Sequence, residues 1–294
     1  MTPKINLLKH IIIIMIVNLC LSSQPLLIKD DLGVLHSFLE KPKRVISLAP
    51  NMTEMIYLLE VDSTLVGNTK YCYYPEEAKS VTKVGDMITF NFEKIVELQP
   101  DLILITVEGN QKTAYDKLID LGLKVFVSNP RDYIGIKKTF NDLGEIFDKE
   151  EQTNNLTNEW DSTYNYILDQ SKNLKTKDVM ILVELNPIMV AGRNTFINSY
   201  LEICNMKNFA EDLKMNYPVF SREVVIERDP QIIVYPSSGS ENIETLRGMY
   251  PEWKALSAVK KGNVFFVDRD LYFRPGPRFT DALTDFYSRL KKID

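Results

Sequence analysis

The feature of the sequence that most constrains its fold is a segment that occurs twice. Residues 92–104 and 222–234 both place glutamates at their second and sixth positions, a proline at the ninth, and an apolar run after it. Every residue of the second segment lies 130 positions after its counterpart in the first. This repeat predicts two similar lobes that face each other, with a crevice between them where a ligand would bind.

Short β-branched apolar runs alternate with amphipathic helical stretches, a pattern typical of parallel sheets covered by helices. A helix is expected to open at Asn51 to Glu54, capped by Asn51 or Thr53, with Glu54 near its positive end. The chain is therefore predicted to be α/β, with two Rossmann-like lobes. The strands are expected at residues 44–48, 65–67, 102–105 and 125–127 in the first half, and at 179–184, 231–235 and 264–267 in the second.

A long helical region separates the two halves. Residues 133–175 read as helix, and neither glycine nor proline occurs between Glu150 and Pro187. One helix over residues 150–174 would run about 37 Å at about 1.5 Å per residue, which is enough to bridge two lobes. A pair of helices broken near Asn154 is the alternative. We thus expect an N-terminal lobe over 24–132, a linking helical region over 133–175 and a C-terminal lobe over 176–294.

The first 23 residues are typical of an export signal. Two lysines precede the apolar run 11–17, and Asn18 interrupts this run before it could span a membrane. Two processing routes remain open. Cys20 follows an imperfect lipobox and would carry a lipid anchor, whereas cleavage after Ser22 would release a free periplasmic protein. Membrane attachment is expected only through that anchor.

Composition excludes several classes of function. The chain has a net charge of −5 and no basic run, so it is a poor partner for nucleic acid. After signal removal only Cys72, Cys204 and His36 remain of the cysteines and histidines, too few for a zinc site or a nucleophile with its base. His36 is expected in an N-terminal hairpin, as a surface residue with no role. We therefore predict neither an enzyme nor a cofactor; a carboxylate-only enzyme or a surface adhesin on the same scaffold is the alternative of another class.

Several segments together resemble the class III periplasmic binding proteins, which carry cobalamin, ferric siderophores or haem to ABC importers. The resemblance covers nearly the whole mature chain. It implies two α/β lobes joined by one rigid long helix, with small movements on binding. A monomer working with a permease dimer and its ATPase is expected. The segments are residues 28–33, 42–50, 91–103, 220–223 and 274–278.

Among members of this family, the chain is most similar to the cobalamin carriers. The resemblance places Tyr71 and Tyr217 at aromatic positions of the ligand cleft, and Arg274 at its rim. Cobalamin or a related corrinoid is thus the expected ligand, with a ferric siderophore or haem as the alternative. Three non-aromatic residues, Met87, Thr106 and Met189, occupy positions that are aromatic in those relatives.

Other residues bear on the alternative ligands. Cys72 and Tyr73 belong to a cluster with Tyr71 and Tyr74 that lines a cleft wall or, alternatively, ligates iron. Haem carriers often place an axial tyrosine where this chain has Asp86. A ferric siderophore would call for basic cleft residues, for which Arg193, Arg222 and Arg274 are candidates.

The resemblance also assigns a docking role and a free thiol. Glu93 and Glu223, one on each lobe, align with the glutamates that engage arginines of the transporter. Two equivalent exposed carboxylates suit a dimeric permease, although each also fits the first turn of a helix, where the helix dipole stabilises an acid. The resemblance aligns Cys204 with a half-cystine whose partner position here holds Tyr287, so Cys204 is expected to be a free buried thiol. A disulfide to Cys72 is not expected, because it would cross the cleft and lock the lobes.

Overall fold

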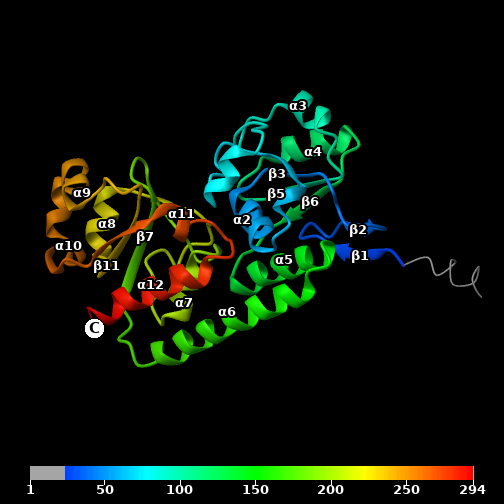
Figure 1. Ribbon diagram of the computed structural model, residues 1–294. Coiled ribbons are helices and arrows are strands. Elements are labelled where there is room, and N and C mark those ends of the chain that lie inside the picture. The colour runs from blue at the N-terminus through cyan, green and yellow to red at the C-terminus, as the bar shows by residue number, and fades with distance from the viewer. Residues whose placement is uncertain (1–23, 294) are drawn as a thin grey trace, which may run out of the picture.

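The computed structural model describes residues 24–293, which form two α/β lobes above a pair of helices (Figure 1). The sheet of the N-terminal lobe has the strand order β4-β3-β5-β6, and all of its pairings are parallel. Every residue of β3, β5 and β6 is buried, as expected for strands covered by helices on both faces. The strands are β3 (Val45–Ser47), β4 (Leu65–Asn68), β5 (Leu102–Thr106) and β6 (Val125–Ser128).

The sheet of the C-terminal lobe has the order β10-β8-β7-β11-β12, with β9 also pairing with β7. Strands β7, β11 and β12 run parallel to one another, whereas β8 pairs antiparallel with both β7 and β10. The sequence analysis predicted the parallel strands and missed this antiparallel edge, because β8 and β10 are too short to show periodicity. The strands are β7 (Asp178–Glu184), β8 (Ile188–Val190), β9 (Lys207–Asn208), β10 (Val219–Phe220), β11 (Ile232–Ser237) and β12 (Val264–Asp268).

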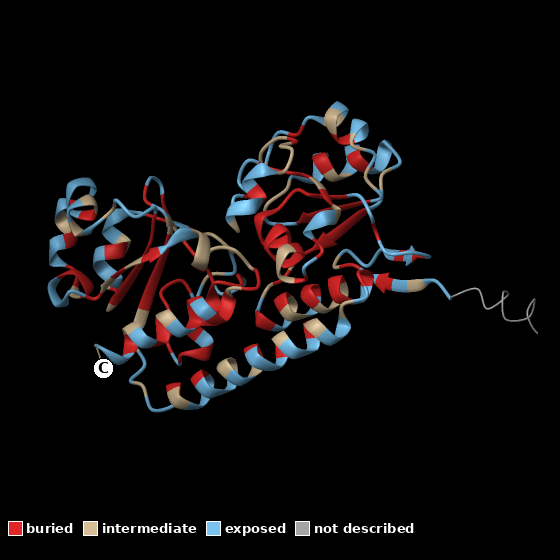
Figure 2. Ribbon diagram, viewed as in Figure 1, coloured by how far each residue is buried: buried red, intermediate tan, exposed pale blue. Residues whose placement is uncertain are grey.

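Helices cover the faces of both sheets and bury their inner sides against the strands (Figure 2). The N-terminal lobe has α2 (Pro50–Leu58), α3 (Phe92–Glu97) and α4 (Lys112–Asp120). The C-terminal lobe has α7 (Asn198–Ile203), α8 (Arg222–Arg228), α9 (Ile243–Met249), α10 (Ser257–Lys261), α11 (Arg269–Tyr272) and α12 (Phe279–Lys291). Three short 3-10 helices lie at Asp62–Thr64, Glu76–Ser80 and Pro251–Ala255.

The linking region consists of α5 (Tyr133–Ile146) and α6 (Glu150–Ser171). The single long helix is confirmed, and the alternative break near Asn154 is not present. Glu150 and Glu151 occupy the first turn of α6, where the helix dipole favours acids. Helix α6 runs beneath both lobes, and α5 and α12 pack against it one after the other along its length (Figure 1).

A stack of four aromatic rings joins the lobes at this level. Tyr164 of α6 stacks on Tyr133 of α5 with ring centroids 4.5 Å apart, and Tyr133 lies 5.7 Å from Phe279 of α12. Phe279 in turn stacks on Tyr200 of α7 at 4.8 Å. One hydrophobic cluster contains buried residues of both lobes and of the linking helices. The lobes therefore share a core as well as a connection.

Two local predictions were wrong. Helix α2 begins at Pro50 with Ala49 as its N-cap, because a proline fits the first helical position. The hydroxyl of Thr53 instead donates to Ser47 Oγ at 2.8 Å. His36 does lie in a hairpin, between β1 (Leu26–Lys29) and β2 (Leu35–Phe38), but it is buried, with Nε2 3.0 Å from Asp30 Oδ2.

The predicted export signal and Cys20 lie outside the described residues. Within residues 24–293 no helix is long and apolar enough to cross a membrane. Both cysteines of this range, Cys72 and Cys204, are free and fully buried, so the prediction of a free thiol at Cys204 is confirmed.

Burial raises the pKa of the Cys204 thiol to about 12, so it stays protonated at neutral and mildly alkaline pH. We expect neither Cys72 nor Cys204 to react with a thiol reagent such as DTNB at pH 8 in the folded protein lacking residues 1–23. Both should react in denaturant. Rapid labelling of the folded protein would contradict the burial described here.

Candidate functional site

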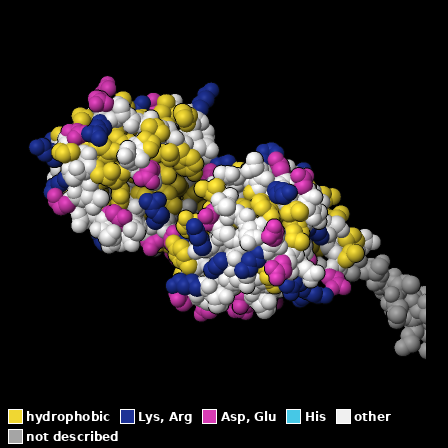
Figure 3. Space-filling view, turned by 90° about the horizontal axis from the view of Figure 1, so that it is seen from above, with side chains coloured by type: hydrophobic (Ala, Val, Ile, Leu, Met, Phe, Trp, Pro, Cys, Tyr) yellow, Lys and Arg dark blue, Asp and Glu magenta, His cyan; other side chains and the backbone are white. Residues whose placement is uncertain are grey.

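A cavity of about 660 Å³ lies between the two lobes. The N-terminal lobe contributes Tyr71 and Tyr73, and the C-terminal lobe contributes Tyr217, Phe196 and Phe273. Seen from above, hydrophobic side chains gather on the C-terminal lobe beside the junction (Figure 3). A concave site with aromatic walls and a few polar groups is typical of small-molecule binding.

The polar residues of the cavity follow the carboxyl ends of strands. Glu108 comes two residues after β5, Arg131 three after β6, and Arg269 and Asp270 directly after β12. Ligands of open α/β sheets bind outside these strand ends. The sequence analysis missed all four residues, although their positions just after predicted strands were a signal that could have identified them.

Six of the eight residues predicted to bind the ligand line this cavity: Tyr71, Tyr73, Met87, Thr106, Tyr217 and Arg274. Cys72 does not, because its side chain is fully buried in the N-terminal lobe with Sγ 3.3 Å from Thr69 Oγ1. Met189 does not line it either; it lies on β8, paired with Val219. The candidate siderophore contacts Arg193 and Arg222 are also absent from the lining.

Two hydrogen-bonded bridges of the same kind cross the cavity in opposite directions. Glu108 of the N-terminal lobe pairs with Arg131 and accepts a hydrogen bond from the Tyr217 hydroxyl, 3.0 Å away. Conversely, Asp270 of the C-terminal lobe pairs with Arg274 at 2.9 Å and accepts one from the Tyr73 hydroxyl. In each bridge, a carboxylate that is ion-paired with an arginine accepts a hydrogen bond from a tyrosine of the other lobe.

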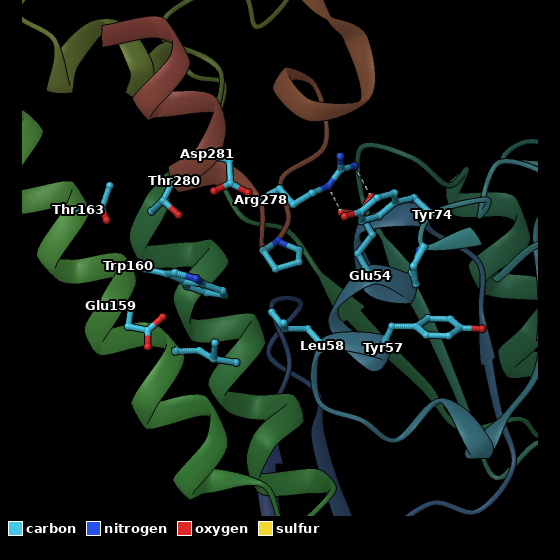
Figure 4. Close-up of a pocket in the computed structure, with 13 residues that line it drawn as sticks. Glu54, Tyr57, Leu58, Tyr74, Glu159, Trp160, Thr163, Arg278, Thr280 and Asp281 are labelled. Carbon is cyan, nitrogen blue, oxygen red and sulfur yellow. Dashed lines mark hydrogen bonds and ion pairs between the residues drawn. The ribbon is translucent and has the colours of Figure 1, made fainter. Parts of the chain in front are cut away.

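Behind the cavity a buried cluster of three charges joins the lobes. Glu54 of α2 is only 2% exposed and lies 3.0 Å from Arg274 and 2.8 Å from Arg278, both on the loop between α11 and α12. Figure 4 shows Arg278 reaching Glu54 across the junction, with Tyr74 beside it. The predicted role of Glu54 as a helix-end acid is therefore wrong, and Arg274 is not a free positive charge.

The cavity wall near β5 is shaped by a glycine. A Cβ at Gly109 would lie 2.4 Å from Met87 Cε and 2.9 Å from Thr106 Cγ2, so only glycine lets these side chains lie where they do. The buried Thr106 Oγ1 has no hydrogen-bond partner among the described residues. Because such atoms usually find a partner, Thr106 is a candidate contact for a polar ligand group.

Comparison with known proteins decides the family. Residues 45–271 match the family described as "Periplasmic binding protein". The chain belongs to this family. It is therefore a substrate-binding transport protein of the ABC type rather than an enzyme.

Individual periplasmic binding proteins are similar over most of their length. An ABC transporter substrate-binding lipoprotein of Bacillus subtilis, YvrC, is 30% identical over 255 residues, which cover 84% of this chain and 79% of that protein. The structure of the periplasmic vitamin B12 binding protein BtuF of Vibrio cholerae matches with a TM-score of 0.76 and 26% identity, covering 85% of this chain and 97% of BtuF. A periplasmic heme binding protein of Pseudomonas aeruginosa shares the fold at a TM-score of 0.76 and 21% identity, with coverage of 85% and 92%.

Two residues that bear on the iron-containing alternatives already have partners within this periplasmic binding protein. The Tyr73 hydroxyl donates to Asp270, and burial together with this hydrogen bond raises the pKa of Tyr73. Asp86 accepts hydrogen bonds from the amides of Ile88 at 2.8 Å and Thr89 at 2.7 Å, which lower its pKa to about 2. It closes a turn, and no group of three potential His, Cys, Asp or Glu metal ligands occurs among residues 24–293.

The two predicted docking glutamates occupy equivalent positions on the lobes. Glu93 lies in the first turn of α3, after the N-cap Asn91, and Glu223 lies in the first turn of α8, after the N-cap Ser221. Both are exposed, and neither forms an ion pair within the described part of the chain. Their geometry satisfies the helix-dipole interpretation and leaves both carboxylates available to a partner.

Proposed function

We propose that this periplasmic binding protein captures a cobalamin or related corrinoid between its lobes and delivers it to a membrane permease dimer powered by an ATPase. The protein is expected to be exported, and to stay at the membrane only if Cys20 carries a lipid. The observation that carries the ligand assignment is the charge balance of the cavity.

The charges that line the cavity nearly cancel. Arg131 is paired with Glu108, and Arg274 with Asp270 and Glu54, which leaves Arg269 as the one lining arginine without an ion pair in residues 24–293. A ligand with two or three negative charges would meet too few free cations here to offset its desolvation. A neutral ligand rich in amides can instead donate to Glu108 and Asp270 and accept from the arginines.

The cavity walls fit a flat, largely apolar body with polar edges. Tyr71, Tyr217 and Phe273 provide aromatic surface, and Met87 adds an adaptable thioether. A cavity of about 660 Å³ is within the range for cofactor-sized ligands, and a corrinoid would project from its mouth. The haem and siderophore alternatives share the scaffold, but they require either a free iron ligand or a more basic cleft.

Titration with cyanocobalamin by isothermal calorimetry tests the ligand directly. We expect binding with one-to-one stoichiometry by the protein lacking residues 1–23, because the cavity that contains Tyr71 and Tyr217 takes one wall from each lobe and so forms one site per chain. The matched controls are hemin and a neutral ferric hydroxamate under the same conditions. Absence of heat with cyanocobalamin, together with saturable binding of hemin or the hydroxamate, would contradict the corrinoid assignment. The proposal that the protein is a ligand carrier would not be affected.

A further inference from the structure

Two short helices, one on each lobe, expose the same combination of side chains. Glu93 and Val96 lie three residues apart on α3, and therefore on one side of that helix. Glu223 and Ile226 have the same spacing on α8, each 130 positions after its counterpart. Val96 is 45% exposed and Ile226 is 39% exposed.

Packing within the lobes does not require these two aliphatic residues. On each helix the inward position is filled by a fully buried neighbour, Ile95 in α3 and Val225 in α8. Single exposed aliphatic residues are common on protein surfaces and need no explanation. Here, however, two of them recur at equivalent positions, each beside an exposed glutamate. This recurrence indicates that both residues contact a partner molecule.

We propose that Val96 and Ile226 are docking residues, each inserted into an apolar socket next to a basic side chain on one half of a two-fold symmetric permease. This inference rests on the delivery step of the proposed function and adds an apolar component to it. Equivalent helices on the two repeated lobes match two equivalent sites, which a two-fold symmetric partner provides. Its sockets must be basic because Glu93 and Glu223 form no ion pair among residues 24–293.

Charge alone would give a contact that salt removes, whereas an apolar contact persists at high ionic strength. The hydrogen bond from the Ser221 hydroxyl lowers the pKa of Glu223 and keeps its carboxylate charged on an exposed surface. Each of the two helices would therefore make one charged and one apolar contact. The binding of the glutamate variant and that of the aliphatic variant should respond differently to salt.

Binding of the fluorescently labelled protein to right-side-out membrane vesicles of the cells that produce it tests the inference. Val96→Ser with Ile226→Ser should weaken binding at least tenfold, at both about 0.05 M and about 0.5 M salt. Glu93→Gln with Glu223→Gln should weaken it strongly only at the lower salt. The matched control is Ile134→Ser with Leu168→Ser, two exposed aliphatic residues of the linking helices, which should bind like the wild type.

The possible failures are distinguishable. If the wild type does not bind vesicles, or the glutamate variant binds as well as the wild type, the delivery role is contradicted and the inference with it. If the wild type binds and the glutamates matter, but the Val96 and Ile226 variant stays within twofold of its control, only the inference is overturned. Thermal unfolding and ligand titration of each variant show that the fold and cleft are unchanged.

Discussion

Replacing Glu54 with alanine is expected to lower the free energy of unfolding by about 3 to 5 kcal/mol, because it leaves the partly buried Arg278 without its counter-charge and Arg274 with Asp270 alone. The Arg274 side chain is 11% exposed and that of Arg278 is 21% exposed. Burial alone would lower the pKa of Arg278, but its hydrogen bonds to Glu54 raise it, so Glu54 keeps this partly buried guanidinium charged.

Urea denaturation followed by circular dichroism measures this loss as a lower transition midpoint at an unchanged slope. The matched control is Glu76→Ala, which removes an exposed glutamate that pairs with Lys79 at 2.6 Å and should cost less than about 1 kcal/mol. Equal stability of the two variants would show that the charge cluster between the lobes contributes no more than a surface ion pair.

Replacing Tyr217 with alanine is expected to weaken ligand binding by about tenfold to a hundredfold, since it removes an aromatic wall and one of the two bridges across the cavity. Tyr217 lines the cavity, and its hydroxyl reaches Glu108 of the opposite lobe. Titration calorimetry with the ligand identified for the wild type gives the affinity change.

Two further variants separate the contributions of Tyr217. Tyr217→Phe keeps the aromatic ring and loses only the hydroxyl, so we expect it to retain most of the affinity. Tyr166→Ala removes an exposed tyrosine of α6 that lies outside the cavity and should have no effect. An unchanged affinity of Tyr217→Ala would exclude this residue from the binding site.

The sequence predicted the architecture well because the architecture depends on periodic patterns. Buried strands such as β5 and β11 are continuous apolar runs, and α6 lacks any glycine or proline that could interrupt it. The repeat around Glu93 and Glu223 predicted that the chain has two similar lobes that face each other. These signals are local and are summed over many residues, so single exceptions do not hide them.

The site was harder to predict because its residues act through partners far away in the sequence. Glu54 looked like a helix-end acid, and only its contacts with Arg274 and Arg278, more than 200 positions later, show its role. Cys72 lies between two cavity tyrosines but points into the core, since the direction of a loop side chain is set by tertiary packing. His36 was misjudged for the same reason, because its partner Asp30 is visible only in the folded hairpin.

The aromatic stack from Tyr164 through Tyr133 and Phe279 to Tyr200 has a consequence for the transport cycle. Rings packed this closely resist a wide swing of one lobe against the other, because parting them would expose apolar surface to water. A bound molecule would then have a long residence time, since spontaneous opening rarely frees it. Release of the ligand would then require the transporter to separate the two lobes, so that the ligand is released at the transporter rather than in free solution.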